Sequence, residues 1–265
     1  MRLFAVFGFL LAWPAAGEYA EIHGLRMYYE VHGEGRPVVL LHGGMTTIEF
    51  SFAAQIPVLA HNHRVIAVEQ MGHGHTADIP RRELSYADMA EDTAAFLVQQ
   101  GIRNVDLIGH SDGGQIALRL AFRHPELVRR VIVSGVGLGP VTAEQQKAML
   151  TISADGLPKA FREEYARISP DGPEHWLPLF ERVKAMWSKP GWGISLAELA
   201  TIKVPTLLVF GDHDFTSLEE AAQIFHSIPD AQIFILPGVG HGTFRERPEW
   251  LNPILLDFLD RDSKH

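Results

Sequence analysis

Short apolar segments alternate with amphipathic helical segments along most of this chain, and that alternation restricts the fold more than any other feature. The runs PVVLL (37–41), RVIAV (64–68) and NVDLI (104–108) have the length and composition of buried strands. Between the last two, the segment 85–100 carries apolar residues at helical spacing, with Ser85 placed to cap its start. Strands that lack a polar face are typical of a mostly parallel sheet with helices on both faces. We therefore predict an α/β fold built around such a sheet.

The same pattern continues toward both ends of the chain. Residues 19–22 and 25–31 are predicted to form a hairpin that turns at His23 and Gly24. Further strands are predicted for 128–134, 206–210 and 231–236, and further helices for 50–60, 111–123, 218–227 and 248–259. Ser217 and Glu220 match a capping box at the start of the helix 218–227.

The alternation stops between Gly139 and Val204. Here three helical segments are separated by stretches that contain Pro and Gly: 142–151, 159–168 and 174–187. Thr142 and Gln145 match a capping box, and the segment carries Trp176, Trp187 and Trp192. An aromatic-rich insertion between two core strands favours a lid over a site, with a purely structural subdomain as the alternative. The predicted organisation is a core of residues 18–139 and 204–265 with a helical cap of residues 140–203.

The N-terminus has the pattern of a signal peptide. Arg2 precedes an apolar run from Leu3 to Trp13, and small residues follow in Pro14-Ala15-Ala16-Gly17. This run is too short to span a bilayer as a helix. We expect residues 1–17 to be removed on export to the periplasm or the medium; the alternative is a cytoplasmic protein in which they form a short hydrophobic extension.

Composition excludes several kinds of partner and site. The formal net charge is −9, from 32 acidic against 23 basic residues, and no basic cluster exceeds a pair. Nucleic acid is therefore excluded as an expected partner, because phosphate binding needs a basic surface. The absence of cysteine excludes a thiol nucleophile and thiolate zinc sites. The expected partner is a small-molecule substrate. No stable membrane span is expected in the chain, and the sequence does not predict its oligomeric state.

The pentapeptide Gly109-His110-Ser111-Asp112-Gly113 has the form G-x-S-x-G. A predicted strand leads into it and a predicted helix leaves it, which is the context of a nucleophile elbow. The turn is tight, so side chains at 109 and 113 would collide with neighbouring backbone. A helix start capped by a serine is the structural alternative. We predict that Ser111 is a nucleophile at the carboxyl edge of the sheet.

A serine nucleophile needs a base, and the base needs an orienting acid. The strand 206–210 is followed by Asp212 and Asp214, and Asp214 lies further out on the loop, whereas Asp212 is expected to bond backbone at the strand end. The strand 231–236 is followed by a glycine-rich loop that contains His241. The predicted triad is Ser111, Asp214 and His241.

The other histidines are given no catalytic role. His61, His63, His226 and His265 are predicted to lie on the surface. His73 and His75 form an H-x-H pair, but no third ligand with clear spacing accompanies it, so no metal site is predicted.

An oxyanion hole is predicted from His42-Gly43-Gly44-Met45, which follows the strand 37–41. Glycines there leave backbone N–H groups open to a developing negative charge, and the residue after the nucleophile supplies the second donor. We assign the donors to Gly44 and Asp112, with Met45 as the neighbour that could replace Gly44; a turn without a catalytic role is the alternative. Met45 and Trp187 are expected to contact the substrate.

These motifs resemble those of the α/β-hydrolase superfamily, over about residues 21–259. Four landmarks match in order: LLHGG (40–44), GHSDG (109–113), VFGDHD (209–214) and GVGHGTFRERPEWLNPILLDFL (238–259). The segment EQMGHGHT (69–76) resembles the D-x-R-G-x-G-x-S loop, with Glu69, Met71 and Thr76 in place of Asp, Arg and Ser. The resemblance implies an α/β-hydrolase fold with a small helical lid, and it selects Asp214 as the acid.

Within the superfamily the chain is similar to small-lidded esterases, haloperoxidase-like enzymes and carbon–carbon bond hydrolases. The S-D-G-G run is also similar to that of valacyclovir-type amino-acid ester hydrolases, in which the Asp after the nucleophile contributes to holding the substrate's amino group. The alternative for Asp112 is a side chain that faces away or only bonds the loop.

The predicted activity is that of a serine hydrolase that cleaves a carboxylic ester or related acyl bond of a small to medium-sized substrate through an acyl-enzyme. Neither a cofactor nor a metal is required. The alternatives are a cofactor-free perhydrolase or haloperoxidase, or a carbon–carbon bond hydrolase, on the same triad. A non-enzymatic ligand-binding receptor is the alternative from a different class of protein.

Overall fold

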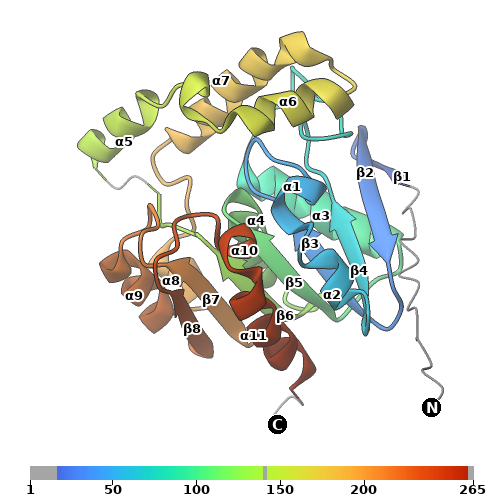
Figure 1. The fold of residues 1–265 in the computed structure, drawn as a ribbon, viewed down its shortest axis with the longest axis vertical. Helices are drawn as coiled ribbons and strands as arrows, with labels where there is room; N and C mark the ends of the chain where they lie inside the picture. Colours follow the sequence, from blue (N-terminus) through green and yellow to red (C-terminus); the bar gives the residue numbers. More distant parts are fainter. Residues whose placement is uncertain (1–16, 140–141, 262–265) are drawn as a thin grey trace, which may run out of the picture.

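The computed structural model describes residues 17–139 and 142–261. The predicted signal peptide therefore lies outside the described residues, except for Gly17. The described residues form an eight-stranded sheet covered by helices, as predicted (Figure 1). Its strands are β1 (Glu18–Ile22), β2 (Leu25–His32), β3 (Arg36–Leu41), β4 (His63–Val68), β5 (Val105–His110), β6 (Val128–Ser134), β7 (Thr206–Gly211) and β8 (Ala231–Leu236).

The strands lie in the order β1-β2-β4-β3-β5-β6-β7-β8. The first two contacts, β1 with β2 and β2 with β4, are antiparallel, and all others are parallel. The predicted hairpin turn is present at His23 and Gly24, which have φ of 49° and 79°. Because β3 to β8 run in parallel, their carboxyl ends share one edge of the sheet.

Helices cover both faces of the sheet. Those outside the segment between β6 and β7 are α1 (Ile48–Phe52), α2 (Ile56–Leu59), α3 (Tyr86–Gln99), α4 (Asp112–Arg123), α9 (Leu218–Ser227), α10 (Thr243–Glu246) and α11 (Pro248–Asp260). Apolar side chains of α3, α4 and α9 pack into one buried cluster, and those of α1, α2, α10 and α11 pack into another. The sheet thus separates two cores, as expected for strands that are apolar on both faces.

Three local predictions were wrong. A single helix over 50–60 is replaced by α1 and α2, because Pro57 lacks the N–H that would bond to the preceding turn. His63 is buried rather than on the surface; it starts β4 and its ring lies 3.1 Å from Asp260 of α11. At α9, Ser217 caps the helix as predicted, but the Glu220 carboxylate accepts from the Leu138 N–H at 2.6 Å instead of closing a capping box.

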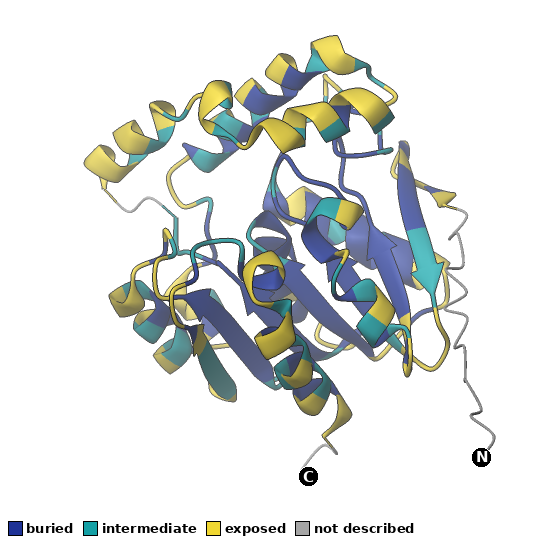
Figure 2. Cartoon of the chain, in the orientation of Figure 1, coloured by how far each residue is buried: buried dark blue, intermediate teal, exposed yellow. Residues whose placement is uncertain are grey.

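The segment between β6 and β7 is helical and lies across the carboxyl edge of the sheet (Figure 1). It contains α5 (Ala143–Leu150), α6 (Lys159–Ile168), α7 (Trp176–Trp187) and α8 (Leu196–Leu199), with 3₁₀ turns at Ala154–Gly156 and Pro173–His175. The predicted capping box at Thr142 is present. Figure 2 shows that α5 and α6 are largely exposed, whereas α7 contributes buried residues. We refer to α5, α6 and α7 as the cap.

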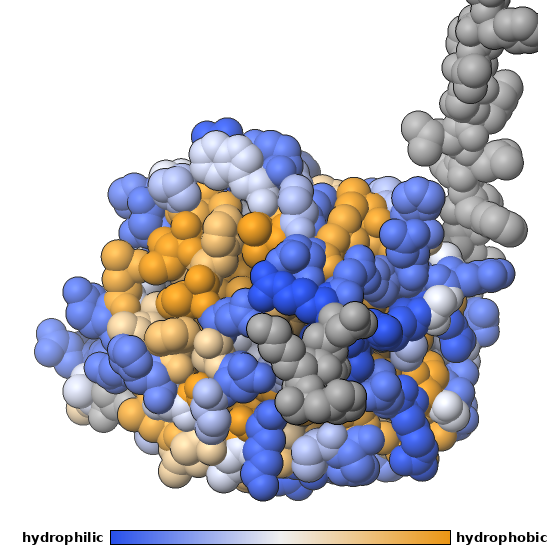
Figure 3. Space-filling model, turned by 90° about the horizontal axis from the view of Figure 1, so that it is seen from below, coloured by the Kyte–Doolittle hydropathy of each residue, from blue (hydrophilic) through white to orange (hydrophobic). Residues whose placement is uncertain are grey.

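The sheet ends at β8, an edge strand in which only Leu236 is fully buried. Figure 3, seen from the side away from the cap, shows hydrophobic residues gathered on the side where α9 and β8 lie in Figure 1. In the described part of the chain, no helix is both long and apolar enough to cross a membrane.

Candidate active site

The loops after β5, β7 and β8 lie at neighbouring positions on one edge of the sheet. His110 at the end of β5 pairs with Ser134 of β6, and Ser134 pairs with Val209 of β7. Gly211 at the end of β7 pairs with Leu236 of β8. Residues just beyond these strands, including Ser111, Asp214 and His241, are thereby brought to the same edge.

Ser111 forms a strained turn between β5 and α4. Its φ is 53°, a left-handed conformation that a residue with a side chain adopts at a cost. Its backbone N–H donates to the Ser134 carbonyl at 2.7 Å, which ties the turn to β6. Ser111 stands at the N-cap of α4, but its side chain makes no capping hydrogen bond. The hydroxyl is therefore not used as a helix cap and stays free for chemistry.

Two glycines make this turn sterically feasible. A Cβ on Gly109 would overlap the Gly113 carbonyl, and a Cβ on Gly113 would overlap the Leu41 carbonyl of β3. Helix α4 therefore begins in direct contact with the sheet, with the partial positive charge of its N-terminus next to Ser111.

The carboxylate that meets His241 is that of Asp214. Its Oδ1 lies 2.7 Å from His241 Nδ1 and also accepts from the Phe215 N–H at 2.6 Å. The Asp214 side chain is fully buried, whereas the His241 ring is 26% exposed. Asp212 instead accepts from the backbone N–H groups of Gly238 and Val239, at 2.7 and 3.2 Å. Asp212 thus holds the loop after β8, and Asp214 orients the imidazole.

The surroundings of His241 are mainly aromatic. The rings of His110 and Phe215 lie 5.0 and 4.9 Å from its ring. Burial, together with the nearby His241, holds the pKa of His110 well below its usual value, so His110 stays neutral. A Cβ on Gly135 would lie 2.6 Å from His241 Cε1, so this glycine leaves the room that the ring occupies.

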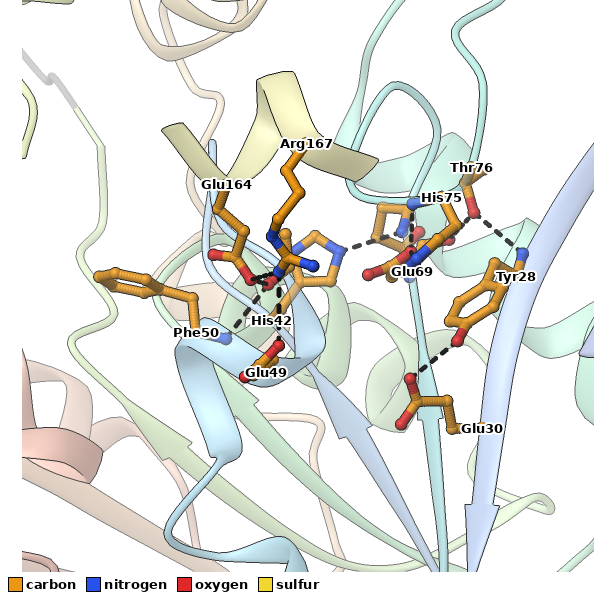
Figure 4. Close-up of polar contacts among 12 residues, drawn as sticks. Tyr28, Glu30, His42, Glu49, Phe50, Glu69, His75, Thr76, Glu164 and Arg167 are labelled. Carbon is orange, nitrogen blue, oxygen red and sulfur yellow. Dashed lines mark hydrogen bonds and ion pairs between the residues drawn. The ribbon is translucent and has the colours of Figure 1, made fainter. Parts of the chain in front are cut away.

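The loop after β3 is anchored at its start by His42. Burial lowers the pKa of His42 to about 3, so the ring is neutral. Its Nδ1 lies 2.8 Å from the Gly43 carbonyl, and its Nε2 accepts from the Gln70 N–H at 3.1 Å. Figure 4 shows His42 between this loop and the loop after β4. The contacts assign the single ring proton to Nδ1.

The predicted oxyanion donors are open. Among the described residues, the N–H groups of Gly44, Met45 and Asp112 have no hydrogen-bond acceptor. Met45 has a φ of 59°, so the loop turns sharply at this position. Met45 was expected to contact substrate; its side chain is buried in the apolar core cluster. Free amide N–H groups beside a nucleophile at a helix start can donate hydrogen bonds to the oxyanion of a tetrahedral intermediate.

The Asp112 side chain does not point away from the protein but binds two donors. Its Oδ1 accepts from the Tyr86 hydroxyl of α3 at 2.6 Å, and Trp187 Nε1 of α7 lies 3.0 and 3.1 Å from the two carboxylate oxygens. The residue is 8% exposed. Burial raises the pKa of Asp112 to about 6, although the two hydrogen bonds and the nearby His241 act in the opposite direction.

Trp187 lies against the predicted oxyanion loop. A Cβ on Gly44 would be 2.7 Å from Cζ2 of the Trp187 ring and would overlap the Asp112 carboxylate. Glycine at 44 therefore allows the cap and the elbow to approach this loop closely. Trp187, which was expected to contact substrate, lies at the predicted oxyanion hole in this structure.

The two histidines of the H-x-H pair make separate contacts. His73 Nδ1 lies 3.0 Å from the Met71 carbonyl. His75 Nδ1 lies 3.1 Å from the Glu69 carboxylate, and Figure 4 shows these two residues side by side. In residues 17–139 and 142–261, no cluster of three or more His, Asp or Glu side chains could hold a metal ion.

Tyr86 and Glu164 are two residues at this site that sequence reasoning missed. Tyr86 begins a helix whose apolar spacing identified it only as a core position. Glu164 lies on the mostly exposed helix α6, yet its Oε1 accepts from the Thr47 hydroxyl at 2.7 Å. Neither contact has a local signal, because the partners lie 26 and 117 residues apart.

The chain is similar in sequence and in fold to proteins that are already known. Residues 38–254 match the family model described as the alpha/beta hydrolase family. A protein provisionally named carbamate hydrolase RutD, from Azorhizobium caulinodans, is 30% identical over 91% of this chain and 97% of its own length. A 2-hydroxymuconate semialdehyde hydrolase from Pseudomonas sp. strain CF600 is 27% identical over 93% of this chain and 94% of its own. The structure of Est816, described as an N-acyl homoserine lactone degrading enzyme, is 26% identical with a TM-score of 0.74, over 91% of this chain and 99% of that one.

Proposed function

The chain belongs to the α/β-hydrolase family. We propose that it is a serine hydrolase with the triad Ser111, His241 and Asp214. It cleaves a carboxylic ester or related acyl bond of a small to medium-sized molecule through an acyl-enzyme. The observation that carries the proposal is the 2.7 Å contact between His241 Nδ1 and the buried Asp214 carboxylate, at the same sheet edge as the strained Ser111.

The mechanism follows from these positions. Asp214 holds the Nδ1 proton of His241, which leaves Nε2 as the basic nitrogen. His241 takes the Ser111 proton as the serine oxygen bonds to the acyl carbon. The carbonyl oxygen becomes an oxyanion that accepts from the N–H of Asp112 and that of Gly44 or Met45.

Collapse of this intermediate breaks the bond to the leaving group, which receives the proton from His241. Water then attacks the acyl-enzyme with His241 again as base. The acid is released, and Ser111 regains its proton. A serine nucleophile forms an acyl-enzyme with esters, lactones and carbamates alike, so the triad by itself does not select among them.

Ester cleavage is the bond class we propose, and three probes separate it from carbamate cleavage. The relatives are named for a carbamate, for 2-hydroxymuconate semialdehyde and for N-acyl homoserine lactones. Since a lactone is a cyclic ester, the last supports the ester class. Hydrolysis of p-nitrophenyl butyrate, p-nitrophenyl N-methylcarbamate and an N-acyl homoserine lactone should be compared at equal enzyme concentration. The ester proposal predicts the highest kcat/KM on one of the two oxygen esters.

The test of the nucleophile uses Ser111→Ala, with Ser227→Ala on α9 as the matched control. Ser111→Ala is expected to lower turnover by about a million-fold and to abolish labelling by a fluorophosphonate probe. Ser227→Ala should leave both unchanged. Activity that survives in Ser111→Ala would refute the assignment. A folded wild type that neither turns over a probe nor reacts with the fluorophosphonate would favour a ligand-binding receptor.

A further inference from the structure

The two loops that supply the oxyanion donors are each tied to the cap by a hydrogen bond. The Trp187 indole N–H of α7 binds the Asp112 carboxylate at the elbow, at 3.0 and 3.1 Å. The Glu164 carboxylate of α6 accepts from the Thr47 hydroxyl, three residues after Gly44, at 2.7 Å. The cap therefore contacts both sides of the predicted oxyanion hole.

These contacts have structural consequences for the loop after β3. Thr47 also caps α1, because its hydroxyl oxygen accepts from the Phe50 N–H at 3.1 Å. Met45 has a left-handed φ, and the amides of Gly44 and Met45 have no acceptor among the described residues. This short stretch is held by the hydrogen bonds from Thr46 to the Gly43 carbonyl, by Thr47 and by the Trp187 ring that lies against Gly44.

Glu164 is well placed to act as a fixed acceptor. Its side chain is only 12% exposed, and Arg167 lies 4.0 Å from it and 3.6 Å from Glu49 of α1. Figure 4 shows Glu164 and Arg167 reaching from α6 toward α1. A groove of about 550 Å³ runs between these helices and is lined by Phe50, Ala53, Ala160 and neighbouring charged residues. Helix α6 thus meets α1 through the Phe50–Phe161 ring contact and through these polar groups.

The elbow side is held by a three-way contact. Tyr86 of α3 and Trp187 of α7 both donate to the carboxylate of Asp112, the first residue of α4. Burial and the negative charge of Asp112 hold the pKa of Tyr86 well above its usual value, so its hydroxyl stays protonated as a donor. Removing the indole N–H would leave a buried carboxylate with one donor fewer, directly beside the proposed oxyanion.

We propose that Trp187 and Glu164 are positioning residues, through which the cap holds the oxyanion-hole loops in their catalytic geometry. The inference rests on the proposed function. An oxyanion donor acts at about 2.7–3.1 Å from the oxyanion, and a displacement near 1 Å costs on the order of a hundred-fold in rate. Removing the Trp187–Asp112 or the Glu164–Thr47 hydrogen bond should therefore lower kcat while KM changes little.

The test uses variants that differ in one hydrogen-bonding group. Trp187→Phe keeps an aromatic ring and removes the N–H. Glu164→Met keeps the length of the side chain and removes the acceptor, whereas Glu164→Gln keeps an acceptor oxygen for Thr47. Glu163→Met is the control, since Glu163 is exposed on the same helix and pairs only with Lys159 in the described contacts. Each full-length variant is assayed for p-nitrophenyl butyrate hydrolysis, for the rate of fluorophosphonate labelling and for Tm.

Trp187→Phe and Glu164→Met are expected to lower kcat and the labelling rate by roughly ten- to a hundred-fold, with KM within about three-fold. Glu164→Gln should restore most of the loss, and Glu163→Met should match wild type. Equal labelling rates for wild type, Trp187→Phe and Glu164→Met would overturn the inference and leave the proposed function intact. A rise confined to KM would also overturn it, because Trp187 would then only bind substrate. A folded wild type that is neither labelled nor active would remove the proposed function itself.

Discussion

Replacing Asp112 by Asn should change how the stability of this protein depends on pH. Burial raises the pKa of Asp112 to about 6 from 3.8. A folded-state pKa above the unfolded value means that the folded protein binds the proton more tightly, so the carboxyl group makes folding less favourable as the pH rises from about 4 to 6. Above about pH 7 the effect is almost fully developed and then stays constant.

The magnitude follows from these two pKa values. Ionising this buried carboxylate costs about 1.6 kcal/mol of folding free energy at pH 5 and about 3 kcal/mol at pH 8. The amide introduced by Asp112→Asn would keep an acceptor oxygen for Tyr86 or Trp187 and would carry no charge. The unfolding free energy of Asp112→Asn minus that of wild type should therefore rise by roughly 1.4 kcal/mol from pH 5 to pH 8.

Urea unfolding of both proteins at pH 5, 6, 7 and 8 measures this difference. Hydrogen bonds gained or lost with the amide shift the difference equally at every pH, so only its slope tests the argument. Glu163→Gln, at an exposed position of α6, controls for the removal of one negative charge. His241 also interacts electrostatically with this carboxyl, so the slope should be measured again with His241→Gln present in both proteins. A difference that stays flat from pH 5 to pH 8 would refute the reasoning.

Two further predictions concern the triad and the elbow. Asp214→Asn should lower kcat by about ten-thousand-fold, because the amide favours the wrong tautomer of His241. The Tm should change little. A kcat within ten-fold of wild type on p-nitrophenyl butyrate would argue against the role of Asp214. Gly113→Ala should cost at least about 3 kcal/mol or prevent folding, because its Cβ would overlap the Leu41 carbonyl. Gly24→Ala, at φ 79° with open space around it, should cost only about 1 kcal/mol, so equal unfolding midpoints for the two variants would contradict the steric argument.

Local features of the sequence were sufficient to predict the layers of the fold. Apolar runs without a polar face identified the strands, and Ser85, Thr142 and Ser217 all cap helices where they were expected. These features are readable because burial on both faces and helix capping depend on residues close together in the chain. The same holds for the elbow, in which the close contacts of Gly109 and Gly113 match the steric reason for expecting glycine.

Predictions that depended on what packs against a residue were less successful. His63 has the polar character of a surface residue, yet α11, nearly 200 positions later, covers it. Glu220 has the right spacing for a capping box, but the Leu138 N–H competes for its carboxylate. Local pattern cannot identify such partners, since they reach the residue only when the chain folds.

Motifs and predicted strands were enough to identify the residues of the proposed triad: a serine on a tight strand-to-helix turn, carboxylates beyond one strand and a histidine beyond the next. Which groups surround these residues depended on how the chain folds. The fold placed Tyr86 and Trp187 on the Asp112 carboxylate, and the Glu164 carboxylate on the Thr47 hydroxyl. The reason is that motif and secondary structure are set by neighbours in the chain, whereas hydrogen-bond partners and electrostatic environment are set by elements far apart in sequence that meet at the carboxyl edge of the sheet.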